Sequence, residues 1–304
     1  MRIAVSGEKI TAACDLKSVM ETQRNVFANH YNGAAFLGPR AVLSQGQNAQ
    51  FAYLARASSA GPTIVKFGTV FPNNPRVGLP AVQTSILVLS AKDGSVSHEF
   101  DGEKITELRT VAASMVAIEK LANPPKKVAV IGLGHQGIAH AKAIRELFSP
   151  NEIIGISKNG NASSSAHTLD RFSNDISEIY DCDLIVAATS SSTPVVNSAL
   201  RAGTTCISIG SFSPDRAEVS IQALKGADQV IVDDCETARK QCGSISQFFQ
   251  SADYPNRTWS ELREIGQVIV ENSGRRDLNE VIYYFSVGLG IQDAALIELI
   301  LERI

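Results

Sequence analysis

A glycine-rich turn between an apolar strand and a helix constrains this chain more than any other feature. Residues 127–139 read Lys-Val-Ala-Val-Ile-Gly-Leu-Gly-His-Gln-Gly-Ile-Ala, with the spacing G-x-G-x-x-G. In this fingerprint Gly132 permits the sharp turn, Gly134 lets a pyrophosphate approach the backbone, and Gly137 lets the helix pack on the strand. The start of the helix offers N–H groups and a positive dipole end to phosphates. The context of strand, turn and helix favours a dinucleotide site over a glycine turn without function.

Strand and helix patterns alternate after this turn. Short apolar runs predict strands at 128–131, 153–156, 184–188, 206–209 and 230–232. Such alternation is typical of a doubly wound parallel sheet, so we predict an α/β fold of the Rossmann type. One connection departs from the pattern: residues 159–165 (Asn-Gly-Asn-Ala-Ser-Ser-Ser) are too few for a full crossover helix. A loop or a stunted helix is predicted there.

The residues before the fingerprint have a different pattern. Apolar residues recur at helical spacing over 105–121, and short β-branched runs predict strands at 63–68 and 84–90. Lys-Asp-Gly-Ser at 92–95 predicts a hairpin turn into a strand at 96–100. This part therefore reads as an α+β domain with antiparallel strands.

Two prolines mark the junction between the parts. Asn-Pro-Pro at 123–125 ends the preceding helix, because proline cannot continue one. The final helix, 291–303, is predicted to be apolar on one face and to pack back on the first domain. We therefore predict a substrate and dimerisation domain at 1–122, completed by 276–304, and a dinucleotide-binding domain at 123–275.

Composition excludes several classes of protein. The 304 residues are 44% hydrophobic and 19% charged, with a formal net charge of -3, which gives no electrostatic case for nucleic acid or an anionic membrane. No apolar run approaches the length of a membrane span, and the N-terminus lacks the apolar core of a signal peptide. The five cysteines are widely spaced and form no metal-ligand pattern, so reduced thiols, no metal and a cytoplasmic location are expected.

The residues after the second predicted strand bear on the choice of cofactor. NAD sites usually carry Asp or Glu there, to bind the ribose hydroxyls. This chain has Ser157, Lys158 and Asn159, which suit a 2′-phosphate because they donate hydrogen bonds and Lys158 adds positive charge. NADPH is therefore preferred, with NADH possible. The alternative is that Lys158 is an ordinary solvated lysine.

Three cations of the first domain have small or apolar neighbours. Arg40 follows Leu-Gly-Pro, Lys66 lies inside an apolar strand, and Arg109 interrupts a helix rich in Ala, Val and Ile. A cation in an apolar element usually meets an anion. Each one alone is better explained by a surface charge or a structural ion pair. Together they suggest a clamp for a substrate carboxylate, to which arginine is suited.

Several motifs resemble those of the ornithine cyclodeaminase/mu-crystallin family. They are Lys-Phe-Gly-Thr-Val-Phe-Pro-Asn-Asn-Pro at 66–75, Gly-Leu-Pro at 78–80, Asp-Gly at 101–102, Ile-Thr-Glu-Leu-Arg-Thr-Val-Ala-Ala-Ser at 105–114, and Ser-Val-Gly-Leu at 286–289. With the fingerprint, they cover almost the whole chain. The resemblance implies a nucleotide domain, a dimerisation and substrate domain, and a homodimer.

The resemblance also implies a range of chemistries. Members convert ornithine to proline with NAD+, reduce cyclic ketimines with NAD(P)H, act as alanine dehydrogenases, or bind ligands with NADPH as mu-crystallins do. Arg40, Lys66 and Arg109 match the positions that bind the substrate carboxylate. The catalytic Asp of the cyclodeaminases is matched by Phe212, which cannot accept a proton. This departure favours the reductase branch.

The predicted function is an NAD(P)H-dependent reductase of small cyclic imino acids, which turns pyrroline-2-carboxylate or piperideine-2-carboxylate into L-proline or L-pipecolate. The alternatives are a cyclodeaminase, an alanine dehydrogenase-like enzyme or a ligand-binding protein of the mu-crystallin type. Lys66 and Arg109 are the predicted catalytic residues, Lys66 either as proton donor or only as a carboxylate-binding cation. The predicted cofactor contacts are Thr110, Gly132, Gly134, His135, Gln136, Gly137, Ser157, Lys158, Asn159, Thr189, Ser211 and Ser286.

Overall fold

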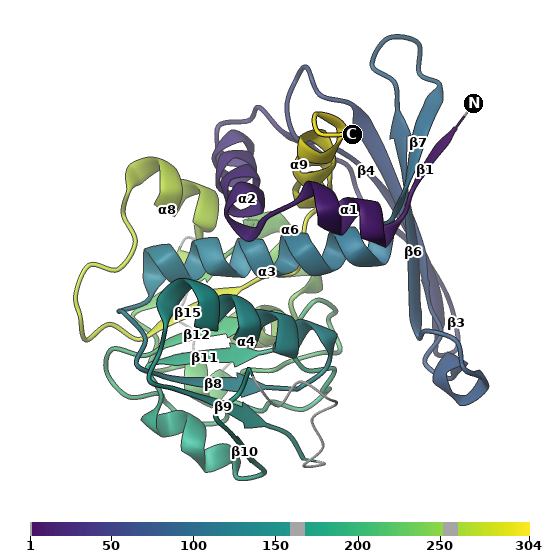
Figure 1. Ribbon diagram of the computed structural model, residues 1–304. Coiled ribbons are helices and arrows are strands. Elements are labelled where there is room, and N and C mark those ends of the chain that lie inside the picture. Colours follow the sequence, from purple (N-terminus) through teal and green to yellow (C-terminus); the bar gives the residue numbers. More distant parts are fainter. Residues whose placement is uncertain (1, 159–167, 252–260) are drawn as a thin grey trace. The chain divides into compact units, whose positions relative to one another are not determined.

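The computed structural model describes residues 2–158, 168–251 and 261–304, in two compact units (Figure 1). The first unit is Met1–Ala112 with Leu289–Ile304, and the second is Ala113–Gly288. These boundaries fall inside a helix and before the last helix, whereas the sequence placed them at 122–123 and 275–276. The assignment of the substrate to one domain and the cofactor to the other stays a prediction.

The first unit is built on a mostly antiparallel sheet. Its strands lie in the order β1-β7-β6-β5-β4-β2, with β3 paired to β4 and only β1 and β7 parallel. The elements are β1 (Ile3–Val5), α1 (Gly7–Ala13), α2 (Leu16–Tyr31), β2 (Phe36–Leu37), β3 (Ala41–Gln45), β4 (Asn48–Arg56), β5 (Thr63–Val70), the 3-10 helix η1 (Asn74–Val77), β6 (Val82–Leu89), β7 (Val96–Asp101), the start of α3 (Gly102–Leu121) and α9 (Gly290–Leu301). The predicted strands, the hairpin turn and the helix before the prolines are confirmed.

Strand register decides which side chains share a face of this sheet. Tyr53 of β4 lies opposite Lys66 of β5, and Lys66 lies opposite Ile86 of β6. Residues directly opposite one another point to the same face of a sheet. That face is buried at all three positions, so Lys66 belongs to the core side of its strand.

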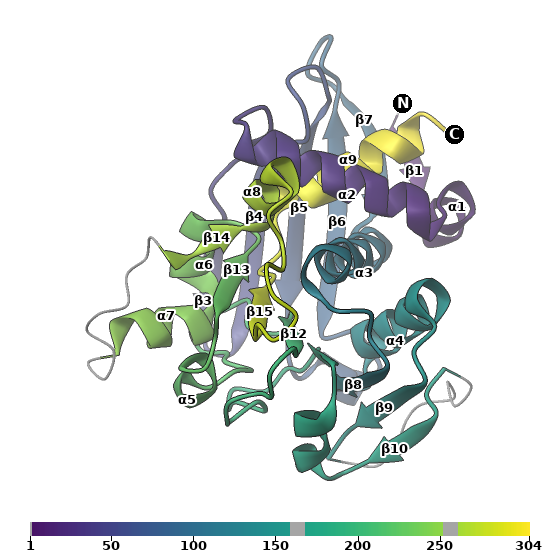
Figure 2. The ribbon, with the colours of Figure 1, turned by 90° about the vertical axis from the view of Figure 1, so that its left-hand side faces the viewer.

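Helix α9 contacts α2, β4 and β5, and Figure 2 shows it beside α2. The sequence predicted one apolar face, and this is wrong for the first two turns. Residues 290–297 are all buried, including Gln292 and Asp293. The reason is that α2 and the strands cover different sides of the helix, so both sides are inside. Its expected return to the first unit is confirmed.

The second unit holds a parallel sheet in the order β10-β9-β8-β11-β12-β15-β13-β14. Its elements after α3 are β8 (Lys127–Ile131), α4 (His135–Phe148), β9 (Glu152–Ile156), β10 (Arg171–Ser173), the 3-10 helix η2 (Ile176–Asp181), β11 (Leu184–Ala187), β12 (Thr205–Ser208), α5 (Ile221–Leu224), β13 (Gln229–Val232), α6 (Cys235–Gln241), α7 (Gly243–Gln250), β14 (Arg263–Glu264), α8 (Ile265–Glu271) and β15 (Ile282–Phe285). The doubly wound fold and its five predicted strands are confirmed. Residues 159–165, predicted as a loop or stunted helix, lie outside the described residues.

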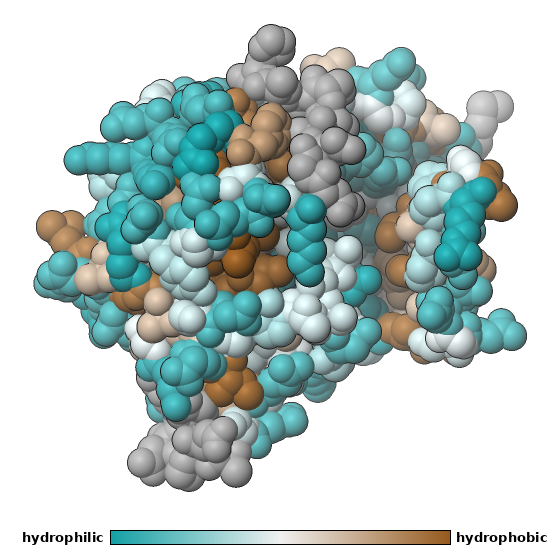
Figure 3. Space-filling model, turned by 90° about the horizontal axis from the view of Figure 1, so that it is seen from below, coloured by the Kyte–Doolittle hydropathy of each residue, from teal (hydrophilic) through white to brown (hydrophobic). Residues whose placement is uncertain are grey.

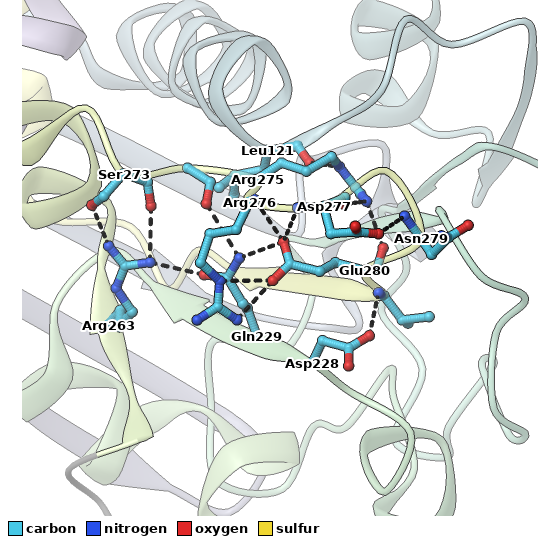
Figure 4. Close-up of polar contacts among 12 residues, drawn as sticks. Leu121, Asp228, Gln229, Arg263, Ser273, Arg275, Arg276, Asp277, Asn279 and Glu280 are labelled. Atoms are coloured by element: carbon cyan, nitrogen blue, oxygen red, sulfur yellow. Dashed lines mark hydrogen bonds and ion pairs between the residues drawn. The ribbon is translucent and has the colours of Figure 1, made fainter.

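The sequence did not predict three strands of the second unit, β10, β14 and β15, of which β15 matters most. All four of its residues are buried, and it lies between β12 and β13. The chain reaches β15 through a polar turn that Figure 4 shows. Arg275 donates to the carbonyls of Leu121 (2.9 Å) and Glu280 (2.6 Å), and the Glu280 carboxylate accepts from the backbone N–H of Arg276 (2.8 Å) and from Gln229 (2.9 Å). Because Gln229 begins β13, these bonds lie at the amino end of the sheet and hold β15 in place.

Hydrophilic residues predominate on the face shown in Figure 3, with separate apolar patches between them. Among the described helices, none has both the length and the apolar character needed to span a bilayer.

Candidate substrate and cofactor sites

The glycine turn has the steric properties that a dinucleotide requires. Gly132 has φ +88°, and a Cβ there would lie 2.5 Å from the carbonyl oxygen of Ala188. A Cβ on Gly137 would lie 1.9 Å from the carbonyl oxygen of Gly132. Beside Gly134, in contrast, there is no atom within 4 Å of the Cβ position. The packing of the protein itself thus requires glycine at Gly132 and Gly137, while Gly134 leaves open space where a pyrophosphate would approach.

The first turn of α4 supplies the groups for that phosphate. Gly134 is its N-cap and makes no side-chain cap, and the first helical hydrogen bond runs from the N–H of Ile138 to Gly134 (3.1 Å). The first-turn N–H groups therefore have no partner within the helix. The side-chain oxygen of Gln136 is buried without a hydrogen-bond partner among the described residues. Both observations fit a bound dinucleotide; His135, next to them, is exposed.

The predicted 2′-phosphate contacts follow β9 directly. The backbone N–H of Ser157 donates to Ser173 (3.1 Å), Ser157 is half-buried, and Lys158 is exposed. Asn159 lies outside the described residues. Neither Ser157 nor Lys158 is acidic, so the reasoning for NADPH stands as a prediction.

A buried carboxylate that the sequence reading missed organises the loops after β11 and β12. Glu218 is fully buried and accepts hydrogen bonds from Thr189 N (2.6 Å), Thr189 Oγ1 (2.8 Å), Ser208 Oγ (2.7 Å) and Gly210 N (2.7 Å). Burial raises the pKa of Glu218, although these hydrogen bonds act in the opposite direction. Ser211 is buried and accepts from the backbone N–H of Glu218 (3.0 Å). The hydroxyls of Thr189 and Ser211 are thus used within the protein, and their predicted cofactor contacts remain predictions.

Two further predicted hydroxyls also have partners in the protein. Ser286 donates to Asp233 (3.3 Å), which also accepts from the backbone N–H of Gly288 (2.7 Å). Asp233 is buried, and burial raises its pKa to about 6. Thr110 donates to the carbonyl of Thr106 (2.6 Å) within its own helix. The hydroxyls of Ser286 and Thr110 thus donate to groups of the protein, and their contacts with a cofactor remain predictions.

The cations of the first unit meet a carboxylate of the protein. Lys66 is 3% exposed, and its Nζ lies 3.0 Å from Oδ1 of Asp293. Nε of Arg109 lies 3.4 Å from the same oxygen, and Tyr53 donates to Oδ2 (2.8 Å). The sequence reading missed Asp293. The same criterion that selected the cations would have found it, because it is an acidic residue in an apolar helix.

Arg40 joins this group through an aromatic ring. Its guanidinium lies over the ring of Tyr53, 5.4 Å from the centroid, and its charge acts on Lys66. Arg40, Lys66 and Arg109, hereafter the cation cluster, are therefore brought together within the first unit. Whether they hold one substrate carboxylate is not tested by these contacts.

The cation cluster and Asp293 carry three positive charges and one negative charge, which leaves a surplus of two positive charges. Burial, together with the charges of Arg109 and Arg40, lowers the pKa of Lys66 to about 8 against the attraction of Asp293. Burial alone would raise the pKa of Asp293, but Lys66, Arg109 and the Tyr53 hydroxyl hold it below its usual range. Lys66, Arg109 and Asp293 are buried and Arg40 is half-buried, and a surplus of positive charge in such surroundings favours an anion.

Phe212 follows β12, at the edge of the parallel sheet where such folds bind ligands. Its side chain is 40% exposed, and the guanidinium of Arg216 lies 4.7 Å from its ring centroid. The nearby Asp215 is bonded by the hydroxyl of Ser213. Among the described residues, no group of His, Cys, Asp and Glu is placed to hold a metal ion.

Comparison with known proteins agrees with these features. The model of the ornithine cyclodeaminase/mu-crystallin family matches residues 3–304. A Delta(1)-pyrroline-2-carboxylate reductase of Bacillus thuringiensis subsp. konkukian is 26% identical over 79% of this chain and 76% of that protein. An alanine dehydrogenase of Archaeoglobus fulgidus is 28% identical over 99% of this chain and 94% of that protein. A solved structure of Thermococcus litoralis Delta(1)-pyrroline-2-carboxylate reductase, in complex with NADH and L-proline, has a TM-score of 0.91, 24% identity, and coverage of 99% of this chain and 97% of that one. This last likeness concerns the fold.

Proposed function

The chain belongs to the ornithine cyclodeaminase/mu-crystallin family, and we propose that it is an NAD(P)H-dependent reductase of small cyclic imino acids. The observation that carries the proposal is the cation cluster, which keeps two surplus positive charges around one buried carboxylate. Relatives named pyrroline-2-carboxylate reductase support it, including one of Azospirillum brasilense that is named for the piperideine substrate as well.

The proposed chemistry assigns a role to each member of the cation cluster. NAD(P)H, when bound, supplies a hydride to the imine carbon. Arg109 and Arg40 hold the carboxylate of the substrate, because arginine binds carboxylates through paired N–H donors. Lys66 gives a proton to the ring nitrogen as the C=N bond is reduced, and regains it from solvent. A lysine whose pKa is about 8 suits this role near neutral pH.

NADPH is proposed as the preferred reduced cofactor. Ser157 and Lys158 stand where NAD-specific sites carry an acid, and an acid there would repel a 2′-phosphate. NADH is expected to serve more weakly.

A second copy of the chain is the proposed partner. Phe36, Leu43, Leu54 and Phe67 lie on one face of the first unit's sheet by strand register, the face opposite to that of Lys66. Leu43 is 75% exposed and Leu54 is 50% exposed. Exposed apolar patches of this kind mark protein interfaces. Sedimentation should show a dimer, and Leu54→Lys should weaken it; a monomeric wild-type protein would contradict this part. The cytoplasmic location is proposed too, and the unpaired state of all five cysteines supports it.

One alternative has a specific observation in its favour. The alanine dehydrogenase of Archaeoglobus fulgidus matches nearly the whole chain, and its name implies a non-cyclic substrate. A cyclodeaminase is disfavoured because Phe212 offers no acid-base group. A binding protein of the mu-crystallin type would retain NADPH and ligand without turnover.

A substrate panel separates these possibilities. Purified protein is mixed with NADPH or NADH and with pyrroline-2-carboxylate, piperideine-2-carboxylate, or pyruvate and ammonia. Loss of reduced-nicotinamide absorbance is followed. The cyclic imines should turn over faster with NADPH. Turnover of pyruvate and ammonia alone would replace the proposal by the alanine dehydrogenase. Ammonia release from ornithine with NAD+ would move the chain to the cyclodeaminases. Tight NADPH binding without turnover would favour the binding protein.

A further inference from the structure

Asp293 is the one acidic group in contact with Lys66 and Arg109 among the described residues, and it lies on the helix that closes the first unit. We propose that Asp293 is a positioning residue, which keeps Lys66 protonated and turns Lys66 and Arg109 so that each retains donors for one imino-acid substrate. This inference rests on the proposed reduction for its chemistry, but its physical part concerns only the state of Lys66.

The carboxylate of Asp293 uses both of its oxygens. Oδ1 lies between Lys66 Nζ (3.0 Å) and Arg109 Nε (3.4 Å), and Oδ2 accepts from Tyr53 (2.8 Å). Burial and the charge of Asp293 raise the pKa of Tyr53 well above its ordinary value, so the phenol stays a donor. Asp293 is fully buried. Two hydrogen bonds, from Lys66 and Tyr53, and the ion pair with Arg109 fix the orientation of this carboxylate, and the carboxylate in turn orients the two cations.

Lys66 and Arg109 each keep N–H donors that could bind a substrate. Lys66 has three N–H donors, of which Thr106 (2.5 Å) and Asp293 take two among the described residues. Arg109 turns Nε toward Asp293 and donates from Nη1 to Gln292 (3.1 Å), which leaves Nη2 without a partner among the described residues. Gln292 thus accepts from Nη1 and Asp293 lies against Nε, which leaves Nη2 available to a carboxylate.

The charge of Asp293 matters because burial and two nearby guanidinium groups disfavour the protonated form of Lys66. The charged or titratable groups that face Lys66 are Asp293, Arg109, Arg40 and, through Asp293, Tyr53. Burial, Arg109 and Arg40 all lower the pKa of Lys66, and Asp293 alone raises it. Without that carboxylate, Lys66 would be a buried amine under the influence of two positive guanidinium groups and would lose its proton at lower pH. A neutral amine cannot supply a proton to the imine nitrogen.

The test measures Lys66 directly and then measures catalysis. Protein labelled with 13C at lysine Cε is titrated by NMR, and Lys66→Arg identifies the Lys66 signal. The Lys66 transition is expected near pH 8 in the wild-type protein. In Asp293→Asn it should move to lower pH by about one pH unit or more. In Arg109→Met, which removes a like charge, it should move to higher pH. Asp293→Glu should restore most of the wild-type transition.

The pH profile of kcat/KM for the imino acid should follow these transitions. Its high-pH limb should move to lower pH in Asp293→Asn and should disappear from the range near pH 8 in Lys66→Arg, whose charge does not titrate. An unchanged Lys66 transition in Asp293→Asn would overturn the inference. If Asp293→Asn does not fold, the direction of the shift in Arg109→Met decides, and a shift to lower pH overturns it. If the NMR shifts occur but the wild-type protein reduces no imine, the proposed function fails and the electrostatic role of Asp293 stands.

Discussion

Replacing Glu218 by Gln should destabilise the second unit far more than the loss of one charge on a surface would. Both carboxylate oxygens face a backbone N–H: Oε1 accepts from Thr189 (2.6 Å) and Oε2 accepts from Gly210 (2.7 Å). A backbone N–H cannot reverse its polarity, so either orientation of the glutamine places an NH2 group against a donor. One buried hydrogen bond is lost and one backbone donor is left unsatisfied. These two effects together cost about 2–4 kcal/mol.

Urea unfolding measures this free energy, and Ser208→Ala is the matched control. Its hydroxyl contacts the same carboxylate (2.7 Å), but its loss leaves the acceptor with other donors, so a cost of only about 1 kcal/mol is expected. A cost for Glu218→Gln no larger than that of Ser208→Ala would refute the reasoning. Because Thr189 and Gly210 follow β11 and β12, the variant should also weaken binding of the dinucleotide, which a fluorescence titration with NADPH would detect.

Three further predictions concern the site and the core. Arg109→Met should keep the fold and the affinity for cofactor but reduce kcat/KM for an imino acid by about 2–4 kcal/mol, measured by steady-state kinetics, because a buried partner of the substrate carboxylate is lost; an unchanged kcat/KM would remove Arg109 from the site. Ser157→Asp should weaken NADPH binding at least about tenfold and spare NADH, measured by titration of both cofactors; equal effects on the two would mean that this loop does not contact the 2′-phosphate. His140 is fully buried between Ser114 (2.9 Å) and the carbonyl of Gln136 (2.7 Å), and burial lowers its pKa from 6.5 to about 4. The pKa of His140 is lower in the folded than in the unfolded protein, so its contribution to the free energy of unfolding is complete above about pH 6.5. That contribution decreases by about 3 kcal/mol in all as the pH falls toward 4. Urea unfolding across this range should show the loss in the wild-type protein and a flatter dependence in His140→Gln.

The sequence predicted correctly those elements whose cause lies in neighbouring residues, such as a glycine that a turn requires or a short apolar run. The glycine fingerprint, the apolar strands of the second unit and the hairpin turn before β7 all have short-range causes, and each is present in the structure. The cation cluster was also visible, because a charge inside an apolar run is conspicuous in one dimension.

What the sequence did not reveal depends on distant partners. Strand β15 lies between β12 and β13 although it is the last strand in the chain, and no local signal fixes that position. Asp293 is separated from Lys66 by most of the chain, and Glu218 gains its donors from two other loops. Each of these carboxylates is explained only by groups that folding brings to it. The predicted contact of Asn159 is left open, because that residue is outside the described part.

The first unit is made in two parts during synthesis, because its last helix follows the whole second unit in the chain. Residues 1–112 leave the ribosome before the second unit does, with Lys66 and Arg109 already among them. Their counter-charge, Asp293, emerges only after all of residues 113–288 have been made. Until then the sheet lacks the helix that covers Tyr53 and Lys66, and the cations can face water. The parallel sheet of the second unit has its own last strand at Ile282–Phe285, immediately before that helix. A nascent chain therefore acquires its final core strand and the carboxylate between its cations within one short stretch of translation.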